Sequence, residues 1–161
     1  RGECVGVRRD GGCAECVRAD GQGEAIARNL FEMSSLKTPI LSILIGEGGS
    51  GGALALAVAD EVWMMENAVY SILSPEGFSS ILWKDSKRAK EAADSMKLTA
   101  ADLKKAGIVE RVFEEPAHFS KDHMEDVAEV LRSQIDQFLL KYGSMDSIEL
   151  CEHRYQRFRK Y

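Results

Sequence analysis

The sequence LSILIGEGGSGGALALAVADEV, residues 41–62, joins an apolar run to a glycine-rich turn and then to a run of small residues. Five of the seven residues from Gly46 to Gly52, here called the glycine turn, are glycine. The apolar run, Pro39 to Ile45, predicts a short strand buried on both faces, and Ala53 to Ala59 predict a short helix. The first amides of such a helix have no partner within the helix, so the turn offers hydrogen-bond donors.

Two nucleotide-binding motifs are compatible with a glycine turn between a strand and a helix. A P-loop is excluded, because Gly51 is followed by Gly52 and Ala53 instead of Lys-Ser/Thr. A dinucleotide-binding turn fits better: Gly46, Gly48 and Gly51 match G-x-G-x-x-G, and Glu66 lies where a ribose-binding acid is expected. Against it, the predicted strands 61–65 and 68–74 are separated only by Glu66 and Asn67, which leaves no room for a crossover helix.

An oxyanion hole is the third interpretation of the turn. Adjacent glycines at the helix start, Gly51 and Gly52, allow a substrate oxygen to approach two backbone amides directly, and the helix dipole adds positive potential there. The residues alone leave another interpretation open, in which the glycines and the following alanines only permit close packing of helix on strand.

The rest of the chain alternates strand and helix patterns, which predicts an α/β fold. Thr99 is placed to cap a helix that Gly107 ends. The helix after residue 121 has one apolar stripe, which is explained by packing on its own domain or by an interface with a partner. Further helices are predicted from Gln22 to the turn before Pro39, over 79–96, over 99–105, over 121–142 and from Ile148, and a last strand over 108–114.

Composition excludes several classes of protein. The 161 residues carry a net charge of −5, which disfavours nucleic-acid binding, and no apolar run is long enough to cross a membrane. Cys13 and Cys16 form a C-x-x-C pair, but no second pair or nearby histidine completes a metal site, so we interpret them as free thiols. We expect a cytoplasmic location, or the plastid stroma for a plant protein.

Long stretches of the chain resemble one family. The stretches GQGEAIARNLFEMS, IGEGGSGGALALAVADEV, YSILSPEGFSSILWKD and RYQRFRKY are similar, almost letter for letter, to the alpha subunit of the bacterial and plastid acetyl-CoA carboxylase carboxyltransferase. The stretch LTAADLKKAGIVERV resembles the wider crotonase superfamily. The resemblance covers residues 21–161 and implies a crotonase-like ββα-superhelix, truncated at its N-terminus and followed by C-terminal helices.

The resemblance also implies a reaction: transfer of the carboxyl group from carboxybiotin, carried by the biotin carboxyl carrier protein, to acetyl-CoA to give malonyl-CoA. In the family the glycine pair after the serine forms the oxyanion hole, which here is Gly51 and Gly52. No side-chain nucleophile, metal or bound cofactor is then expected, and carboxybiotin is a substrate. The implied partner is a beta subunit that binds acetyl-CoA, in a heterotetramer of two alpha and two beta chains.

Further residues are implied on the carboxybiotin side of the site. They come from the turn itself and from a second family stretch that we expect to form a strand-ending turn in the wall of the site. The implied substrate-binding residues are Gly48, Gly49, Ser50, Ser74, Pro75, Glu76 and Gly77.

The chain departs from the family at its start. Residues 1–20 do not match, and we predict that they are disordered or artefactual; the carboxyltransferase core is assigned to residues 21–120 and a helical region to 121–161. The upstream part of the family is absent, so an open sheet edge and exposed apolar surface are expected. Two alternatives remain: an NAD-dependent oxidoreductase and a catalytically inactive crotonase-like interaction module.

Overall fold

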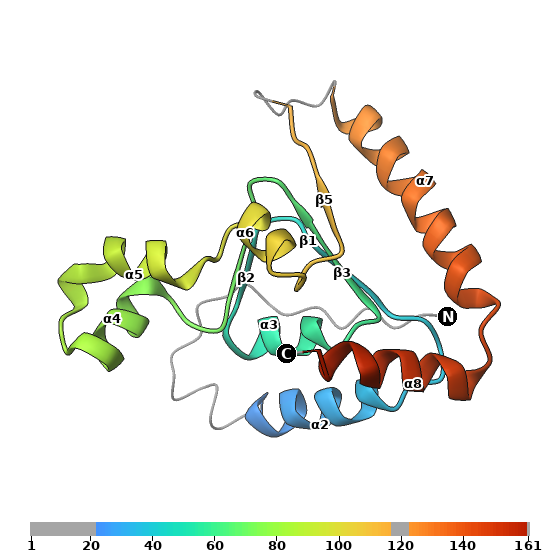
Figure 1. Cartoon of the computed structure of the whole chain (residues 1–161), viewed down its shortest axis with the longest axis horizontal. Coiled ribbons are helices and arrows are strands. Elements are labelled where there is room, and N and C mark those ends of the chain that lie inside the picture. The colour runs from blue at the N-terminus through green and yellow to red at the C-terminus, as the bar shows by residue number, and fades with distance from the viewer. Residues whose placement is uncertain (1–21, 117–122, 161) are drawn as a thin grey trace.

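A computed structural model describes residues 22–116 and 123–160 of the chain (Figure 1). Two successive units have the order strand, strand, helix. The first contains β1 (Leu41–Leu44), β2 (Glu47–Gly49) and α3 (Ser50–Ala57); the second contains β3 (Glu61–Met65), β4 (Val69–Ser71) and α4 (Pro75–Trp83). Residues 1–20, including Cys13 and Cys16, lie outside the described residues.

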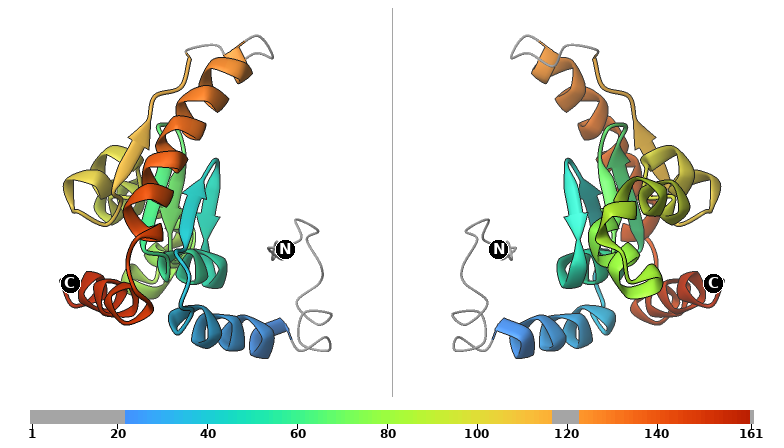
Figure 2. Two further views of the ribbon diagram at one scale, coloured as in Figure 1. Left: turned by 90° about the vertical axis from the view of Figure 1, so that its right-hand side faces the viewer. Right: turned by 90° about the vertical axis from the view of Figure 1, so that its left-hand side faces the viewer.

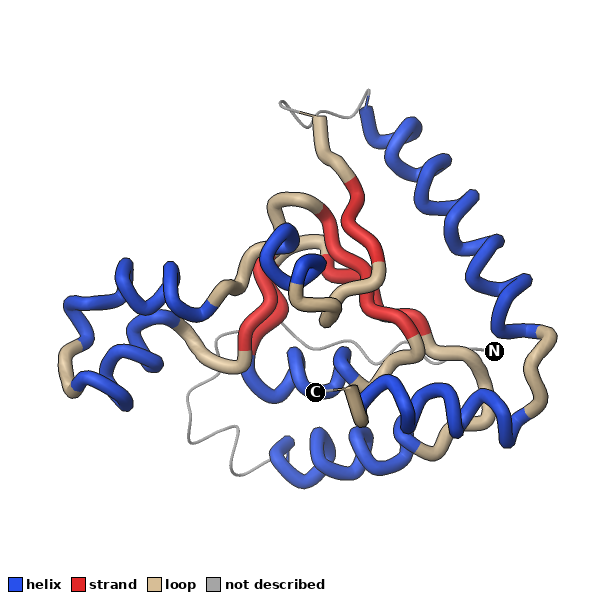
Figure 3. Tube along the Cα trace, viewed as in Figure 1, coloured by secondary structure: helices blue, strands red, loops and turns tan. Residues whose placement is uncertain are grey.

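The strands form two parallel sheets. The first strand of each unit belongs to a sheet with the order β1-β3-β5, in which β5 is Arg111–Phe113, and the second strands pair as β2-β4 (Figure 3). Each unit is therefore one turn of a ββα superhelix, as predicted. Because β3 and β4 lie in different sheets, a short turn can join them without a crossover helix.

The other helices surround these strands. In Figures 1 and 2, α2, α3 and α8 lie below the sheets, α7 runs beside them, and α4 and α5 pack together away from them. No helix among the described residues is both long and apolar enough to cross a bilayer. The remaining helical elements are α2 (Gln22–Ser34), η1 (Ser86–Arg88), α5 (Ala89–Met96), α6 (Ala100–Lys105), α7 (Met124–Gly143) and α8 (Ser147–Phe158).

The core is built around β3, whose five residues are all buried. The Trp63 ring meets Phe113 at a centroid distance of 5.4 Å and Phe138 at 6.1 Å, so β5 and α7 pack on the same strand. Phe138 and Tyr142 of α7 are buried, whereas Val130 nearer its start is 54% exposed. The second half of α7 therefore packs on its own chain, as one interpretation of its apolar stripe predicted.

A buried ion pair joins α8 to the residue that precedes β3. The guanidinium of Arg154 donates from Nε to Asp60 Oδ1 and from Nη2 to Asp60 Oδ2, both at 2.9 Å. Both side chains are almost completely buried. Asp60 Oδ2 also accepts from the Ile40 amide at 2.7 Å. The remaining guanidinium donors bind four backbone carbonyls at the end of α2 and just after it, those of Met33, Ser34, Leu36 and Thr38.

A second carboxylate at the start of β3 is bound by α7. Glu61 accepts from Trp63 Nε1 at 2.7 Å, from Lys141 Nζ at 2.9 Å and from the Tyr142 hydroxyl at 3.0 Å. Burial by itself raises the pKa of Glu61, but the hydrogen bonds from Lys141 and Trp63 outweigh it and hold that pKa below its ordinary value of 4.5. The folded state therefore favours the charged carboxylate.

Replacing Glu61 by glutamine should make stability less dependent on pH. A lowered folded-state pKa means that the carboxylate stabilises the fold above its unfolded value near 4.5, and that this contribution is lost as the pH falls through the lower folded value. We expect Glu61→Gln to cost about 1–3 kcal/mol at neutral pH and progressively less below about pH 4.5. Urea unfolding between about pH 3 and pH 7 measures the unfolding free energy of both proteins. If the two plots of unfolding free energy against pH ran parallel, the prediction would be contradicted.

The prediction of one continuous helix over 79–96 was wrong. The structure contains α4, η1 and α5 in its place, because Lys84 adopts a left-handed backbone (φ 58°) and Asp85 begins a new turn. The expected strand-ending turn at Ser74 is instead the start of α4.

Two predictions about the strand and helix that flank the glycine turn were also wrong. The strand before the turn is not buried on both faces: its residues alternate, and Ile45 after it is 75% exposed. The helix after the turn begins at Ser50 instead of Ala53.

Candidate active site

The glycine turn contains a strand that the sequence did not predict. β2 runs parallel to β4, with Gly48 opposite Tyr70 and Gly49 opposite Ser71. A Cβ at Gly48 would overlap the Leu44 side chain and lie 3.1 Å from Tyr70 Cδ2. A side chain at Gly48 would therefore have to displace the buried Leu44 side chain, so close packing favours glycine there, which is part of what the packing interpretation of the turn proposed.

The chain enters α3 through a left-handed residue. Ser50 has a φ of 55°, uncommon for a residue with a side chain, and it follows Gly49, whose backbone is extended. A left-handed residue followed by helical ones directs successive amides to one side, which is the geometry of an anion-binding nest. Backbone conformations of this kind are concentrated at functional sites.

The backbone amides of Gly51 and Gly52, here called the amide pair, are in the first turn of α3. Helix geometry gives them no partner within α3, and among the described residues they make no hydrogen bond to another element. A Cβ at Gly51 would lie 3.6 Å from the Ile26 side chain, an ordinary contact, and one at Gly52 would meet nothing within 4 Å. The amide pair thus has no hydrogen-bond partner among the described residues, and packing does not require glycine at Gly52.

A pocket of about 340 Å³ lies beside the glycine turn. Its walls are the turn, the strand β4, the start of α4 and a residue that precedes α6. Three serines and one glutamate give it polar side chains, and four residues give it apolar ones. The lining residues are Glu47, Gly48, Gly49, Ser50, Val69, Ser71, Leu73, Ser74, Pro75 and Leu98.

The structure brings five of the nine predicted site residues together in this pocket: Gly48, Gly49, Ser50, Ser74 and Pro75. Gly51 and Gly52 follow Ser50 directly and are half-buried at the helix start. Glu76 and Gly77 are not among the lining residues. The roles of all nine in substrate binding stay predictions.

Sequence reasoning missed the lining residues Val69, Ser71, Leu73 and Leu98. They reach the pocket because β4 pairs with β2 and because the Tyr70 amide donates to the Leu98 carbonyl at 3.1 Å. A three-residue strand that contains two glycines has no apolar period, so no pattern could have indicated that pairing.

The wall at α4 is held by a side-chain cap. Ser74 Oγ accepts from the Gly77 amide at 3.1 Å, and Pro75 occupies the first helical position, where its missing N–H is harmless. The Gly77 amide is therefore used within the helix start, and Glu76 is exposed. This cap fixes where α4 begins and so where Ser74 and Pro75 meet the pocket.

Removing that cap should have a modest, measurable effect. Ser74→Ala leaves the Gly77 amide without its acceptor, and we expect a loss of about 1 kcal/mol of unfolding free energy. Ser74→Thr, which keeps an acceptor at the cap, should recover most of it. Urea denaturation compares the three proteins, and equal stability of the alanine and serine forms would show that the cap contributes nothing.

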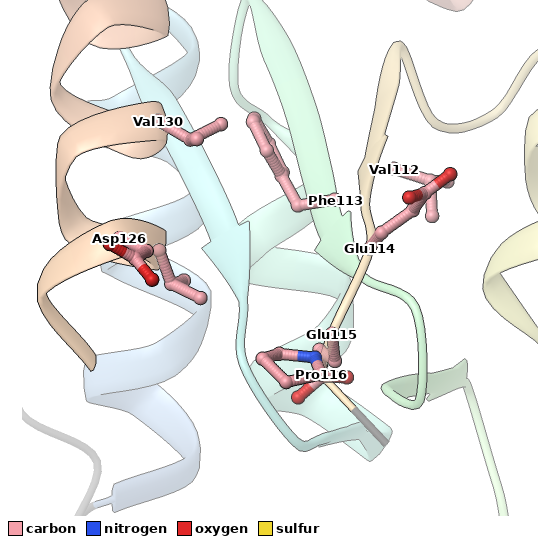
Figure 4. A pocket seen from close by; sticks show the side chains of 8 residues that line it. Val112, Phe113, Glu114, Glu115, Pro116, Asp126 and Val130 are labelled. Atoms are coloured by element: carbon pink, nitrogen blue, oxygen red, sulfur yellow. The ribbon is translucent and has the colours of Figure 1, made fainter. Parts of the chain in front are cut away.

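A larger cavity of about 530 Å³ lies elsewhere, between the end of β5 and the first half of α7 (Figure 4). Three carboxylate side chains line it, those of Glu114, Glu115 and Asp126. Glu115 accepts from the Asn67 amide at 2.8 Å and so has a structural partner. Three carboxylates repel an anionic carboxyl donor more strongly than Glu47 alone does in the pocket at the glycine turn, so this cavity is the poorer candidate.

Sequence comparison finds one family along nearly the whole chain. A family model described as "Acetyl co-enzyme A carboxylase carboxyltransferase-like" matches residues 12–161. The match begins within residues 1–20, ahead of the boundary that the sequence analysis places at residue 21, and that boundary stays a prediction.

Three curated relatives are named as subunits of acetyl-coenzyme A carboxylase carboxyl transferase. The alpha subunit of acetyl-coenzyme A carboxylase carboxyl transferase from Streptococcus uberis is 60% identical over 141 residues, 88% of this chain and 54% of the relative. The one from Clostridium acetobutylicum is 57% identical over 92% of this chain and 54% of its own length. A beta/alpha protein from Natranaerobius thermophilus is 53% identical over 92% of this chain and 24% of its own length. The chain thus spans about half the length of the curated alpha subunits that it matches.

Solved structures share the fold at low identity. A Pseudomonas malonate decarboxylase hetero-tetramer matches with a TM-score of 0.67 and 15% identity, over 89% of this chain and 57% of that one. Transcarboxylase 12S matches with a TM-score of 0.61 and 18% identity, over 79% of this chain and 23% of that one. An enoyl-CoA hydratase from Mycobacterium avium subsp. paratuberculosis matches with a TM-score of 0.53 and 22% identity, over 85% of this chain and 56% of that one. These likenesses confirm the crotonase-like fold and argue against a dinucleotide-binding fold.

Proposed function

Because the chain belongs to the acetyl co-enzyme A carboxylase carboxyltransferase-like family, we propose that it supplies the carboxybiotin half of a carboxyltransferase site. The reaction is transfer of the carboxyl group from carboxybiotin to acetyl-CoA, which gives malonyl-CoA. The observation that carries the proposal is the amide pair, which has no partner among the described residues and directly follows a residue lining the pocket at the glycine turn.

The chemistry needs a site for negative charge on biotin. When the bond between the biotin nitrogen and the carboxyl carbon breaks, its electron pair stays on the ureido group and the carboxyl group leaves as carbon dioxide. The ureido oxygen then carries the charge, and two backbone donors can stabilise it. Preorganised donors of this kind contribute about 3–4 kcal/mol each in a dry site.

The rest of the transfer uses the substrates themselves. The charged biotin nitrogen takes a proton from the methyl group of acetyl-CoA, and the resulting carbanion attacks carbon dioxide to form the new carbon–carbon bond. One proton moves to biotin and one carboxyl group moves to acetyl-CoA, so the atoms balance. This scheme requires no side-chain base from the present chain.

We further propose a beta subunit as the partner that binds acetyl-CoA. The support is the Natranaerobius thermophilus relative, whose name joins beta and alpha subunits in one protein. The proposed assembly has two alpha and two beta chains, receives carboxybiotin on its carrier protein, and works in the cytoplasm.

Reconstitution tests this proposal. The chain is mixed with a purified carboxyltransferase beta subunit and biotin carrier protein carrying labelled carboxyl groups, and transfer of label to acetyl-CoA is measured. We expect labelled malonyl-CoA only when both subunits are present. The Streptococcus uberis alpha subunit serves as the positive control. If that control transfers label and the present chain binds the beta subunit without transfer, the chain is an interaction module instead.

A further inference from the structure

We propose that Tyr70 and Arg157 are positioning residues, which hold α3 at its two ends and thereby set the direction of the amide pair. This inference rests on the proposed function for its catalytic consequence. Neither side chain is required to touch a substrate. Tyr70 belongs to β4 and Arg157 to α8, so the two come from distant parts of the sequence.

Tyr70 contacts the chain on both sides of the amide pair. Its hydroxyl donates to the Ala53 carbonyl at 2.6 Å, directly after the two glycines. Its ring lies against Gly48, which precedes them: a Cβ added at Gly48 would lie 3.1 Å from Tyr70 Cδ2. The ring and hydroxyl of one residue thus fix both the turn and the first turn of α3.

Arg157 holds the other end of the same helix. Its Nη1 donates to the carbonyl of Ala57, the last residue of α3, at 3.2 Å, and its Nη2 donates to the Ile108 carbonyl at 2.9 Å. Glu110 binds the guanidinium through both oxygens, at 2.8 and 3.1 Å, and accepts from the Val62 amide at 2.7 Å. A cation fixed to the sheet at the C-terminal end of α3 also interacts favourably with its dipole.

The two carbonyls lie on one face of α3. Ala53 and Ala57 are four residues apart, so they are stacked one turn apart along the helix. α3 is short and rich in small side chains, and Ala53 is its one buried residue. Packing alone therefore defines its position weakly, and the two hydrogen bonds fix the orientation of the helix axis.

Tyr70 keeps its proton at physiological pH. Burial raises the pKa of Tyr70 to about 12, while the nearby charge of Arg157 acts in the opposite direction. Tyr70 is therefore a permanent donor to Ala53 and has no role as a base.

The geometry of α3 matters because oxyanion donors act over a narrow range of distance, about 2.7–3.1 Å from the charged oxygen. A misplacement of about 1 Å by a substitution away from the chemistry can cost up to a hundredfold in rate. We therefore expect loss of either hydrogen bond to lower turnover more than it lowers substrate binding.

The first test measures the amide pair directly in the full chain. Tyr70→Phe removes only the hydroxyl and keeps the ring, so ring effects on nearby nuclei are preserved. We expect the nitrogen and proton shifts of the Gly51 and Gly52 amides to move while those of Gly143 stay in place. Tyr155→Phe is the matched control, because Tyr155 is 56% exposed, and it should move neither glycine. Unchanged Gly51 and Gly52 shifts in Tyr70→Phe would overturn the proposal.

Arg157→Gln and Arg157→Lys provide an independent test of the hydrogen bond at the C-terminal end of α3. Arg157→Gln removes the cation and should move the same two glycine amides; Arg157→Lys keeps a charged donor and should move them less. Arg159→Gln, at an exposed position two residues later, is the control. Equal shifts for Arg157→Gln and Arg159→Gln would remove Arg157 from the proposal.

The second test measures carboxyl transfer in the complex with a beta subunit. We expect Tyr70→Phe to lower kcat about tenfold, with KM for acetyl-CoA changed less than about twofold. An unchanged kcat in an active complex would contradict positioning. If the unsubstituted chain transfers nothing while its glycine shifts still respond to Tyr70→Phe, the proposed function fails and the positioning contacts stand.

Discussion

Replacing Gly52 by valine should lower malonyl-CoA formation by about a hundredfold or more in the assembled enzyme. Nothing lies within 4 Å of the place where a Cβ at Gly52 would be, and its φ is not positive, so the backbone there accepts a residue with a side chain. The loss would arise because the side chain stands in the space from which a substrate oxygen approaches the amide. Carboxyl transfer is measured with the chain, a beta subunit and carboxylated carrier protein.

Stability separates this effect from damage to the fold. Glycine is a poor helix residue, so Gly52→Ala should leave unfolding free energy unchanged or raise it by up to about 1 kcal/mol. Gly23 offers a matched control, because it lies in the first turn of α2 and its Cβ would also meet nothing within 4 Å. Gly23→Val should transfer carboxyl groups at the normal rate. Full activity of Gly52→Val would remove the Gly52 amide from the proposed oxyanion hole.

Replacing Arg154 by methionine should cost about 3–5 kcal/mol of unfolding free energy, because it leaves the buried Asp60 carboxylate without its charged partner. The substitution also removes the donor to the carbonyls that follow α2. A loss of this size is a large share of the stability of a small domain. Urea unfolding at neutral pH measures it.

The paired substitution shows whether the unpaired charge is the cause. Asp60→Asn combined with Arg154→Met removes both charges, and we expect it to recover part of the loss. Arg88 provides the control: it forms an exposed ion pair with Glu91 at 2.6 Å, and its replacement by glutamine should barely change the unfolding midpoint. A double variant no more stable than Arg154→Met would show that the carbonyl contacts dominate.

Much of the fold could be predicted because local patterns and tertiary packing agree. The apolar residues 61–65 form the buried strand β3, and Thr99 caps α6 through Asp102 as its spacing indicated. The glycine pair lies at a helix start, as the oxyanion interpretation required. Each of these features depends on residues within a few positions of one another.

The rest could not be predicted because it depends on long-range pairing. β2 has no apolar pattern, and its partner strand was needed to place Ser71 in the pocket. Arg154 and Arg157 appear in the sequence as part of a charged tail, yet both are buried, because Asp60 and Glu110 lie beside them in the fold. No local pattern indicates which of several arginines will be buried.

The Arg154–Asp60 pair also bears on how the protein is made. Asp60 pairs with a residue 94 positions later in the chain. On the ribosome, Asp60 and β3 are therefore synthesised long before Arg154, which neutralises the Asp60 charge. Contacts of such sequence separation form late and slow folding, since the loop between them must close first. Nascent chains therefore complete the native fold only after α8 emerges from the exit tunnel, and incompletely folded chains of this kind expose apolar surface that is prone to aggregate.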